Sequence, residues 1–246
     1  MTAAESLYEV YHEACPFPHF GSDTFHGDKA LAAYPDAQSV IDFGCGNGYA
    51  VSEMRRLGHP WFGVEISEAA YKKHLNAPYF YHGATDQFED QQFDMAYSTE
   101  VLEHVPEDVI DHVTADICRV TAKYIFMSIS LRPSSDNNRY HCTLQSRQWW
   151  EEKFTRNGFV VDRDVVDCHQ KMTLKSTKQV FRKYSHLGPI PASFAENPPF
   201  ELNGEKEFWF FAFRREGVPA CPLPKPTVSW VNRKIVPVLR KLLRSA

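Results

Sequence analysis

The segment "TEVLEHVPED" (residues 99–108) carries two carboxylates and an imidazole in a compact spacing. Glu100, Glu103 and His104 stand at positions i, i+3 and i+4, so even one helical turn would place them on one face. Side chains of these types can bind a divalent metal, move a proton, or simply decorate the start of a helix. The segment directly follows "FDMAYS", which is typical of a buried strand, so we expect the three side chains at a strand end.

A second group of chemical interest is the glycine-rich stretch "VIDFGCGNG" (residues 40–48). Glycines that follow a strand let the backbone turn tightly and approach a ligand closely. Asp42, two residues before the first glycine, would repel a phosphate but suits the cationic amino-acid end of S-adenosylmethionine. Glu65 closes the next apolar run, where a carboxylate can accept hydrogen bonds from both ribose hydroxyls.

Short apolar runs alternate with amphipathic stretches and predict the elements that position these residues. The expected strands cover 39–44, 60–67, 79–84, 93–98, 124–131, 159–166 and 207–215, and the expected helices cover 49–58, 68–75, 107–121 and 146–159. This alternation predicts an α/β fold with a Rossmann-like, doubly wound, seven-stranded and mostly parallel sheet whose last strand is antiparallel. The uniformly apolar run at 207–215 should lie inside the sheet, and ligands should bind at the carboxyl ends of the strands.

Three motifs, "VIDFGCGNG", "GVEIS" and "FDMAYSTEVLEHV", in this order and spacing resemble class I S-adenosylmethionine-dependent methyltransferases over roughly residues 37–165. The resemblance implies that the Asp42 segment surrounds the methionine moiety, that Glu65 holds the ribose, and that residues after the third strand flank the adenine. The expected cofactor-binding residues are Asp42, Gly44, Gly46, Gly48, Glu65, Ala84, Thr85, Asp86 and Thr99.

Methyl transfer requires the protein to align a nucleophile with the activated methyl group and to exclude water. An alcohol nucleophile must also lose its proton, either to a base or with the help of a metal. The E-x-x-E-H pattern resembles the metal site of the ubiquinone-pathway O-methyltransferases and of the small-RNA 3′-terminal 2′-O-methyltransferases. In the RNA enzymes a second histidine comes from beyond the fifth strand, and here His141 stands at a comparable place.

Two forms of the reaction centre therefore stay open. In the favoured form His104 works largely alone as the base. In the other, Glu100, Glu103, His104 and His141 gather around a divalent metal.

The acceptor is indicated by a looser pattern, "FGS…HG" with "H-x-T-x5-WW-x3-F-x3-GF". It resembles methyltransferases from bacterial cell-surface polysaccharide and lipopolysaccharide gene clusters, which implies a hydroxyl of a sugar, a glycan or a lipid-linked acceptor. A quinone- or phenol-type small molecule is the alternative acceptor, and a non-catalytic S-adenosylmethionine-binding module is the alternative of another class. A nucleic acid, RNA, is a third candidate acceptor; it is disfavoured because the chain, with a net charge of −4, carries a charge of −10 without its basic C-terminal segment (residues 225–246).

The expected organisation begins with a lid segment over residues 1–36, in which Tyr11, His19 and His26 should face the substrate. The methyltransferase domain follows over 37–217, with an insertion at 167–206 that contains a basic helix. A proline-rich linker (218–226) leads to a basic amphipathic helix (227–246).

The composition of that C-terminal helix suits either docking to an anionic membrane surface or packing against protein. Six scattered cysteines and an N-terminus without a signal-peptide pattern predict a cytoplasmic protein, at the inner membrane face if the C-terminal helix docks there.

Overall fold

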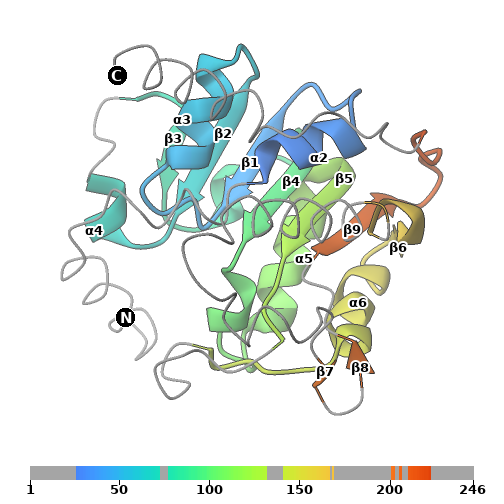
Figure 1. Ribbon diagram of the computed structural model, residues 1–246. Coiled ribbons are helices and arrows are strands. Elements are labelled where there is room, and N and C mark those ends of the chain that lie inside the picture. Colours follow the sequence, from blue (N-terminus) through green and yellow to red (C-terminus); the bar gives the residue numbers. More distant parts are fainter. Residues whose placement is uncertain are drawn as a thin grey trace, which may run out of the picture.

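The computed structural model describes residues 26–72, 77–131, 141–166, 168, 201–202, 205–206 and 210–222. Its main sheet has seven strands in the order β3-β2-β1-β4-β5-β9-β6 (Figure 1). The strands are β1 (Val40–Phe43), β2 (Trp61–Glu65), β3 (Phe80–His82), β4 (Phe93–Thr99), β5 (Thr121–Ser128), β6 (Phe159–Val161) and β9 (Phe210–Arg215). The pairs among β1 to β5 are parallel, and β9 runs antiparallel to both β5 and β6. The predicted fold class is thus confirmed.

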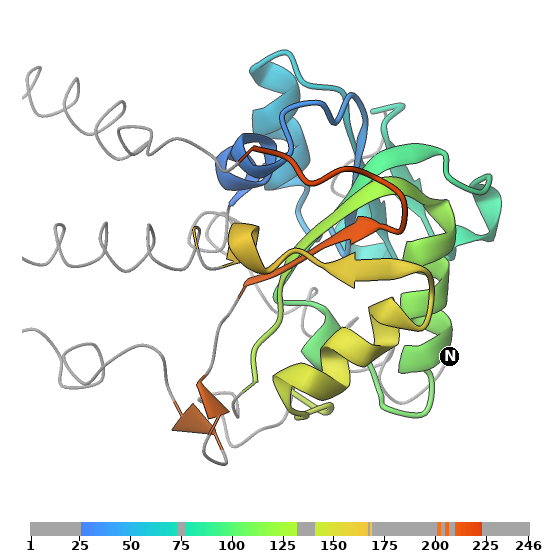
Figure 2. The ribbon, with the colours of Figure 1, turned by 90° about the vertical axis from the view of Figure 1, so that its right-hand side faces the viewer.

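Helices cover both faces of this sheet, with α2 and α3 on one side and α5 and α6 on the other (Figures 1 and 2). The α-helices are α2 (Gly27–Ala33), α3 (Tyr49–Arg56), α4 (Glu68–Tyr71), α5 (Ile110–Val120) and α6 (Arg147–Thr155). Two 3₁₀ turns, η2 (Thr85–Gln87) and η3 (Leu102–His104), follow β3 and β4, and β7 (Glu201–Leu202) pairs with β8 (Glu205–Lys206) in a separate two-stranded sheet. The predicted glycine stops hold, since Gly58 and Gly158 follow α3 and α6 with φ of +91° and +81°.

The core consists of one apolar layer on each face of the sheet. Ile117 of α5 and Trp150 of α6 pack in one layer, and Ala33 of α2 and Met54 of α3 pack in the other. Residues 210–213 of β9 are all buried, because the strand has neighbours on both edges and helices or loops on both faces. The inference that this apolar strand lies inside the sheet is confirmed.

The strand predicted over residues 159–166 is wrong in its second half. β6 ends at Val161, and residues 163–166 are helical. Asp162 causes the change: its carboxyl accepts a hydrogen bond from the Val165 N–H, and its carbonyl accepts one from the Val166 N–H at 3.1 Å. This helix-capping behaviour of aspartate overrides the strand preference of the valines.

Several predictions fall on parts of the chain outside the described residues. They concern Tyr11 and His19, the basic helix of the insertion, and the C-terminal amphipathic helix at 227–246. Within the described part of the chain, no helix combines the length and apolar composition needed to cross a membrane.

Candidate active site

The site lies where the strand order of the sheet changes direction. β1 is hydrogen-bonded to both β2 and β4, and successive strands then run outward on either side. In open parallel sheets, ligands bind at such a switch point, beyond the carboxyl ends of the strands. Asp42 pairs in register with Tyr97, and Thr99 pairs with Ser128, so the predicted cofactor residues and the E-x-x-E-H segment reach the same edge.

The glycine loop after β1 is held against the end of β2. The N–H groups of Gly44 and Cys45 both donate to the carbonyl of Val64, at 3.0 and 3.2 Å. Gly44 has φ of +67°, and a Cβ at this position would lie 2.7 Å from the methyl groups of Val101. Only glycine therefore fits here, and the cofactor loop packs directly on the segment that begins the E-x-x-E-H pattern.

The two predicted cofactor acids are both buried beneath this loop. Glu65 Oε2 accepts a hydrogen bond from the Gly46 N–H at 2.7 Å, and Oε1 accepts one from the Ser67 N–H at 2.9 Å. Each carboxylate oxygen keeps a second lone pair for a ligand hydroxyl. Burial raises the pKa of Asp42 well above its usual range, and the negative charge of Glu65 raises it further. A cationic ligand group would stabilise the ionised form of Asp42.

The segment predicted to flank the adenine forms the turn η2. Ala84 and Asp86 are exposed, whereas the hydroxyl of Thr85 donates to Asp116 Oδ2 at 2.8 Å and so points toward α5. Sequence reasoning missed Ile66, which is 56% exposed immediately after Glu65. The signal was available, because an apolar residue that directly follows a strand-ending acid lies at the ligand edge.

Glu100 takes a different position from the one its spacing predicted. It adopts φ of +55°, a conformation that is rare for residues other than glycine and tends to occur at functional sites. Its N–H donates to the Ser128 carbonyl at 3.1 Å, and its Oε1 accepts a hydrogen bond from the Ser128 hydroxyl at 2.8 Å. The 3₁₀ turn begins only at Leu102, so Glu100 is tied to the end of β5 and does not share a helical face with His104, although its carboxyl still lies beside that of Glu103.

The structure brings together Glu103, His104 and His141. Their ligand atoms all lie within 4.8 Å of one another, and the two imidazole rings meet edge to face, with centroids 4.8 Å apart. Glu103 is fully buried; its Oε1 accepts a hydrogen bond from the Ser130 N–H at 3.2 Å. Its Oε2 has no hydrogen-bond partner in the described part of the chain. A buried carboxylate oxygen beside two imidazoles can serve as a metal ligand or take part in proton transfer.

His141 reaches this group because the segment that follows β5 is bonded to η3. The Thr143 N–H donates to the Glu103 carbonyl at 3.0 Å, and the Thr143 hydroxyl donates to the Val105 carbonyl at 2.6 Å. Cys142 Sγ donates to the His104 carbonyl at 2.9 Å. These bonds run to backbone atoms of η3 and of Val105, which follows it, so they hold His141 beside His104 independently of any ligand of the three side chains.

Burial also changes the proton affinity of this group. It raises the pKa of Glu103 well above the usual carboxyl range, and the negative charge of Glu100 acts in the same direction. A cation beside Glu103, either an imidazolium or a metal ion, would favour its ionised form. One carboxylate oxygen and two imidazole nitrogens form a donor set that suits a divalent transition metal.

His26, expected to face the substrate, lies at the start of α2. Its N–H donates to the hydroxyl of Tyr97 at 3.0 Å, and its ring meets Phe210 edge to face. Its Nδ1 is 3.0 Å from Nζ of Lys29, a residue that sequence reasoning missed. Burial lowers the pKa of Lys29 to about 8. This pair lies beside the carboxyl half of β4, on the sheet face covered by α2.

Comparison with known proteins gives three results. The chain matches a family model described as "Methyltransferase domain" over residues 25–184. It is 25% identical to the malonyl-[acyl-carrier protein] O-methyltransferase of Buchnera aphidicola subsp. Baizongia pistaciae (strain Bp), a match that covers 55% of this chain. The match spans 56% of that protein, so the chain spans about half the length of this curated relative.

Two solved structures share the fold. The magnesium protoporphyrin IX methyltransferase (ChlM) from Synechocystis PCC 6803 with bound SAM has a TM-score of 0.52 at 12% identity, covering 88% of this chain and 99% of that one. A structure described as "Conversion of a Disulfide Bond into a Thioacetal Group during Echinomycin Biosynthesis" has a TM-score of 0.56 at 14% identity, covering 96% and 99%. Together with the family match, they show that this chain belongs to the methyltransferase-domain family and has the fold of an S-adenosylmethionine-dependent methyltransferase.

Proposed function

We propose that this protein transfers a methyl group from S-adenosylmethionine to a hydroxyl of a sugar, a glycan or a lipid-linked acceptor. One observation carries the proposal. The glycine loop with its two buried acids and the group of Glu103, His104 and His141 lie at the same edge of the sheet, in contact through Gly44 and Val101. This arrangement offers a cofactor site and, next to it, a group that can remove a hydroxyl proton.

On this proposal, the cofactor binds across the switch point of the sheet. Asp42 faces the cationic methionine end, and Glu65 adds the ribose hydroxyls to its two backbone hydrogen bonds. The exposed side chain of Ile66 offers an apolar surface to the adenine, and Asp86 offers a carboxylate to its amino group. The remaining assigned contacts belong to Gly44, Gly46, Gly48, Ala84, Thr85 and Thr99.

In the first form of the reaction, His104 is the base that accepts the hydroxyl proton. The acceptor oxygen attacks the methyl carbon while the carbon–sulfur bond breaks, and the hydroxyl proton moves to the imidazole of His104. S-adenosylhomocysteine leaves, and the imidazolium is stabilised by the buried carboxylate of Glu103. His141 packs against the ring of His104 and restricts its orientation.

A metal-assisted form is the second candidate, and it suits a quinone- or phenol-type acceptor as well. Here Glu103, His104 and His141 would hold a divalent ion, which lowers the pKa of a hydroxyl bound to it. The supporting observation is the fully buried Glu103 Oε2, which has no hydrogen-bond partner in the described part of the chain and lies beside two imidazoles.

The test is transfer of radiolabelled methyl from S-adenosylmethionine to a panel of acceptors: lipid-linked and free sugars, a catechol, and the malonyl-acyl-carrier protein named for the relative. We expect labelled sugar, and we expect His104→Gln to lower kcat by about 10²–10⁴-fold, the usual contribution of a general base. The affinity for S-adenosylmethionine should stay unchanged in this variant. Cofactor binding without transfer to any acceptor would instead support a non-catalytic module.

If the acceptor is lipid-linked, the basic segment at 227–246 would bind the anionic cytoplasmic face of the membrane that holds the acceptor. Deleting these residues should release the protein from vesicles that contain anionic lipid. Equal binding of both forms to such vesicles would remove the membrane from the proposal.

A further inference from the structure

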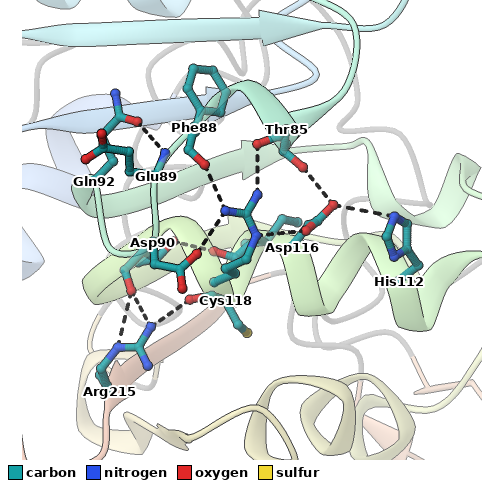
Figure 3. A network of polar contacts seen from close by, with 12 residues as sticks. Thr85, Phe88, Glu89, Asp90, Gln92, His112, Asp116, Cys118 and Arg215 are labelled. Carbon is teal, nitrogen blue, oxygen red and sulfur yellow. Dashed lines mark hydrogen bonds and ion pairs between the residues drawn. The ribbon is translucent and has the colours of Figure 1, made fainter.

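The turn η2, which carries Asp86, is hydrogen-bonded to two side chains of α5. Arg119 donates from Nη2 to the Thr85 carbonyl and from Nη1 to the Phe88 carbonyl, both at 2.8 Å. One guanidinium therefore binds both ends of the turn. Figure 3 shows Thr85, Phe88, Asp90 and Asp116 converging around the place where these bonds meet.

Asp116 completes this attachment. Its Oδ2 accepts the hydroxyl proton of Thr85 at 2.8 Å, and its Oδ1 accepts a hydrogen bond from Arg119 Nε at 3.1 Å. Arg119 also forms an ion pair with Asp90 at 3.1 Å, and its own carbonyl accepts a hydrogen bond from the Gln91 N–H at 2.8 Å. Residues on both sides of Asp86 are thus fixed to one face of a single helix.

The turn needs this support because it is short. η2 contains three residues and has no side-chain cap at its N-terminus. A 3₁₀ turn of this length has weak hydrogen-bond geometry, and in the described part of the chain the only side-chain bonds that its own residues make within or next to it are those from Gln87 Nε2 to the carbonyls of Ala84, at 2.7 Å, and His82, at 3.2 Å. Asp86 is exposed at its centre, so the position of its carboxylate depends on how firmly Thr85 and Phe88 are held.

We infer that Arg119, with Asp116, is a positioning residue for the cofactor: it fixes the turn η2 so that Asp86 meets the adenine without a further cost of ordering. The inference rests on the adenine role proposed for Asp86. Preorganisation of this kind appears as cofactor affinity, because a loose segment must lose its conformational freedom on binding. The planar fork of arginine suits two carbonyls at once, whereas a lysine ammonium cannot reproduce it.

The test is calorimetric titration of the full-length protein with S-adenosylhomocysteine. We expect Arg119→Gln and Arg119→Lys to raise Kd by a similar factor of about 10, since both lose the fork while lysine keeps the charge. Thr85→Val, which removes the hydroxyl that donates to Asp116 and keeps the backbone of the turn, should raise Kd by about threefold. Arg156→Gln is the matched control, because Arg156 is exposed directly after α6 and pairs with Glu152 of that helix, away from this turn.

A double-mutant cycle with Asp86→Ala separates positioning from general stabilisation. If Arg119 acts through Asp86, most of the affinity loss from Arg119→Gln should vanish in the Asp86→Ala background. Fully additive losses, or an unchanged Kd for Arg119→Gln, would overturn the inference. If Arg119→Gln does not fold, Thr85→Val takes its place in the same cycle.

The same measurements distinguish failure of the positioning role of Arg119 from failure of the proposed function. Weakened binding in Asp86→Ala with no effect of Arg119→Gln removes the positioning role and leaves the adenine contact standing. An unchanged Kd for Asp86→Ala removes the adenine contact, and with it the inference. A wild-type protein that does not bind S-adenosylhomocysteine would refute the proposed function itself.

Discussion

Two kinds of charged side chain lie on the same sheet, and they differ in burial and in their partners. Asp42 and Glu103, at the carboxyl ends of the strands, are buried with pKa values held well above the usual carboxyl range. Arg119 of α5 and Arg215 of β9 are only half-buried, and their guanidinium groups donate to backbone carbonyls. The two acids bear a cost of burial that a ligand can relieve, whereas the two arginines have already used their donors to build the scaffold.

Arg215 shows most clearly how a guanidinium stabilises the fold through backbone carbonyls. Its Nε donates to the carbonyls of Thr121 and Ala122, both at 3.2 Å, and its Nη2 donates to the Cys118 carbonyl at 2.7 Å. These carbonyls lie where α5 passes directly into β5, and a helix leaves its last carbonyls without partners. The difference teaches that a charged group whose donors are bonded to the backbone belongs to the scaffold, whereas a buried carboxyl at the ligand edge is a candidate for the site.

The largest expected effect follows from removing the charge of Asp42. Asp42→Asn should raise the Kd for S-adenosylmethionine by about 100-fold, because a hydrogen bond to a charged group contributes about 1.5–3 kcal/mol. The ligand-free protein should become more stable. The pKa of Asp42 is raised in the folded state, so its contribution to stability is present below the ordinary carboxyl pKa and is lost as pH rises through the raised value.

Titration calorimetry with S-adenosylmethionine and scanning calorimetry of the ligand-free protein measure the two quantities, both at pH 7.5, a condition chosen for the test. The melting temperature of the ligand-free variant should rise by about 2–4 °C, the shift that ~1 kcal/mol produces in a chain of this size. Glu216→Gln, which changes an exposed carboxyl, serves as the control. A variant that is less stable than wild type would break the contrast between the two groups of charges.

Arg215→Met should show the opposite pattern with a somewhat smaller free-energy change. It removes the guanidinium donor from the carbonyls of Thr121 and Ala122 and from that of Cys118, which keeps only the Thr121 N–H, and this should lower the free energy of unfolding by about 2 kcal/mol. Cofactor affinity should not change, because these carbonyls lie away from the carboxyl ends of the strands. Denaturant titration and calorimetry check the two halves of this prediction. Weaker cofactor binding, measured under conditions in which the variant is fully folded, would contradict the prediction.

The contrast also explains how far the sequence could predict the molecule. Strands such as β1 and β9 were predictable because buried parallel or central strands need uninterrupted apolar runs, and α3 and α6 because glycine ends them. The acids of the site were visible because they stand directly at the ends of such runs. The helical residues 163–166 were not, because one capping interaction of Asp162 overrode a β-branched pattern.

The arginines could not be assigned from the sequence for a related reason. Their partners are mainly backbone carbonyls, which every residue carries, so no side-chain pattern marks the pairing. Glu100 shows the same limit in the site. Its spacing would join it to Glu103 on a helical turn, but the 3₁₀ turn starts after it, and a positive φ directs it to Ser128.

The smallest effect, and the one that separates the two candidate mechanisms, concerns Glu103. The pKa of its carboxyl is raised in the folded state by burial and by Glu100, so its contribution to stability is lost as pH rises through that value. Glu103→Gln should therefore stabilise the ligand-free protein slightly at neutral pH, with a rise in melting temperature of about 2 °C.

The response to metal ions separates the two mechanisms. With His104 working largely alone as the base, the melting temperature of the wild-type protein should not respond to added Mg²⁺, Mn²⁺ or Zn²⁺, and activity should survive a chelator. A rise in melting temperature with one of these ions that is absent in Glu103→Gln, together with loss of activity on chelation and its rescue by the same ion, would establish the metal-assisted form.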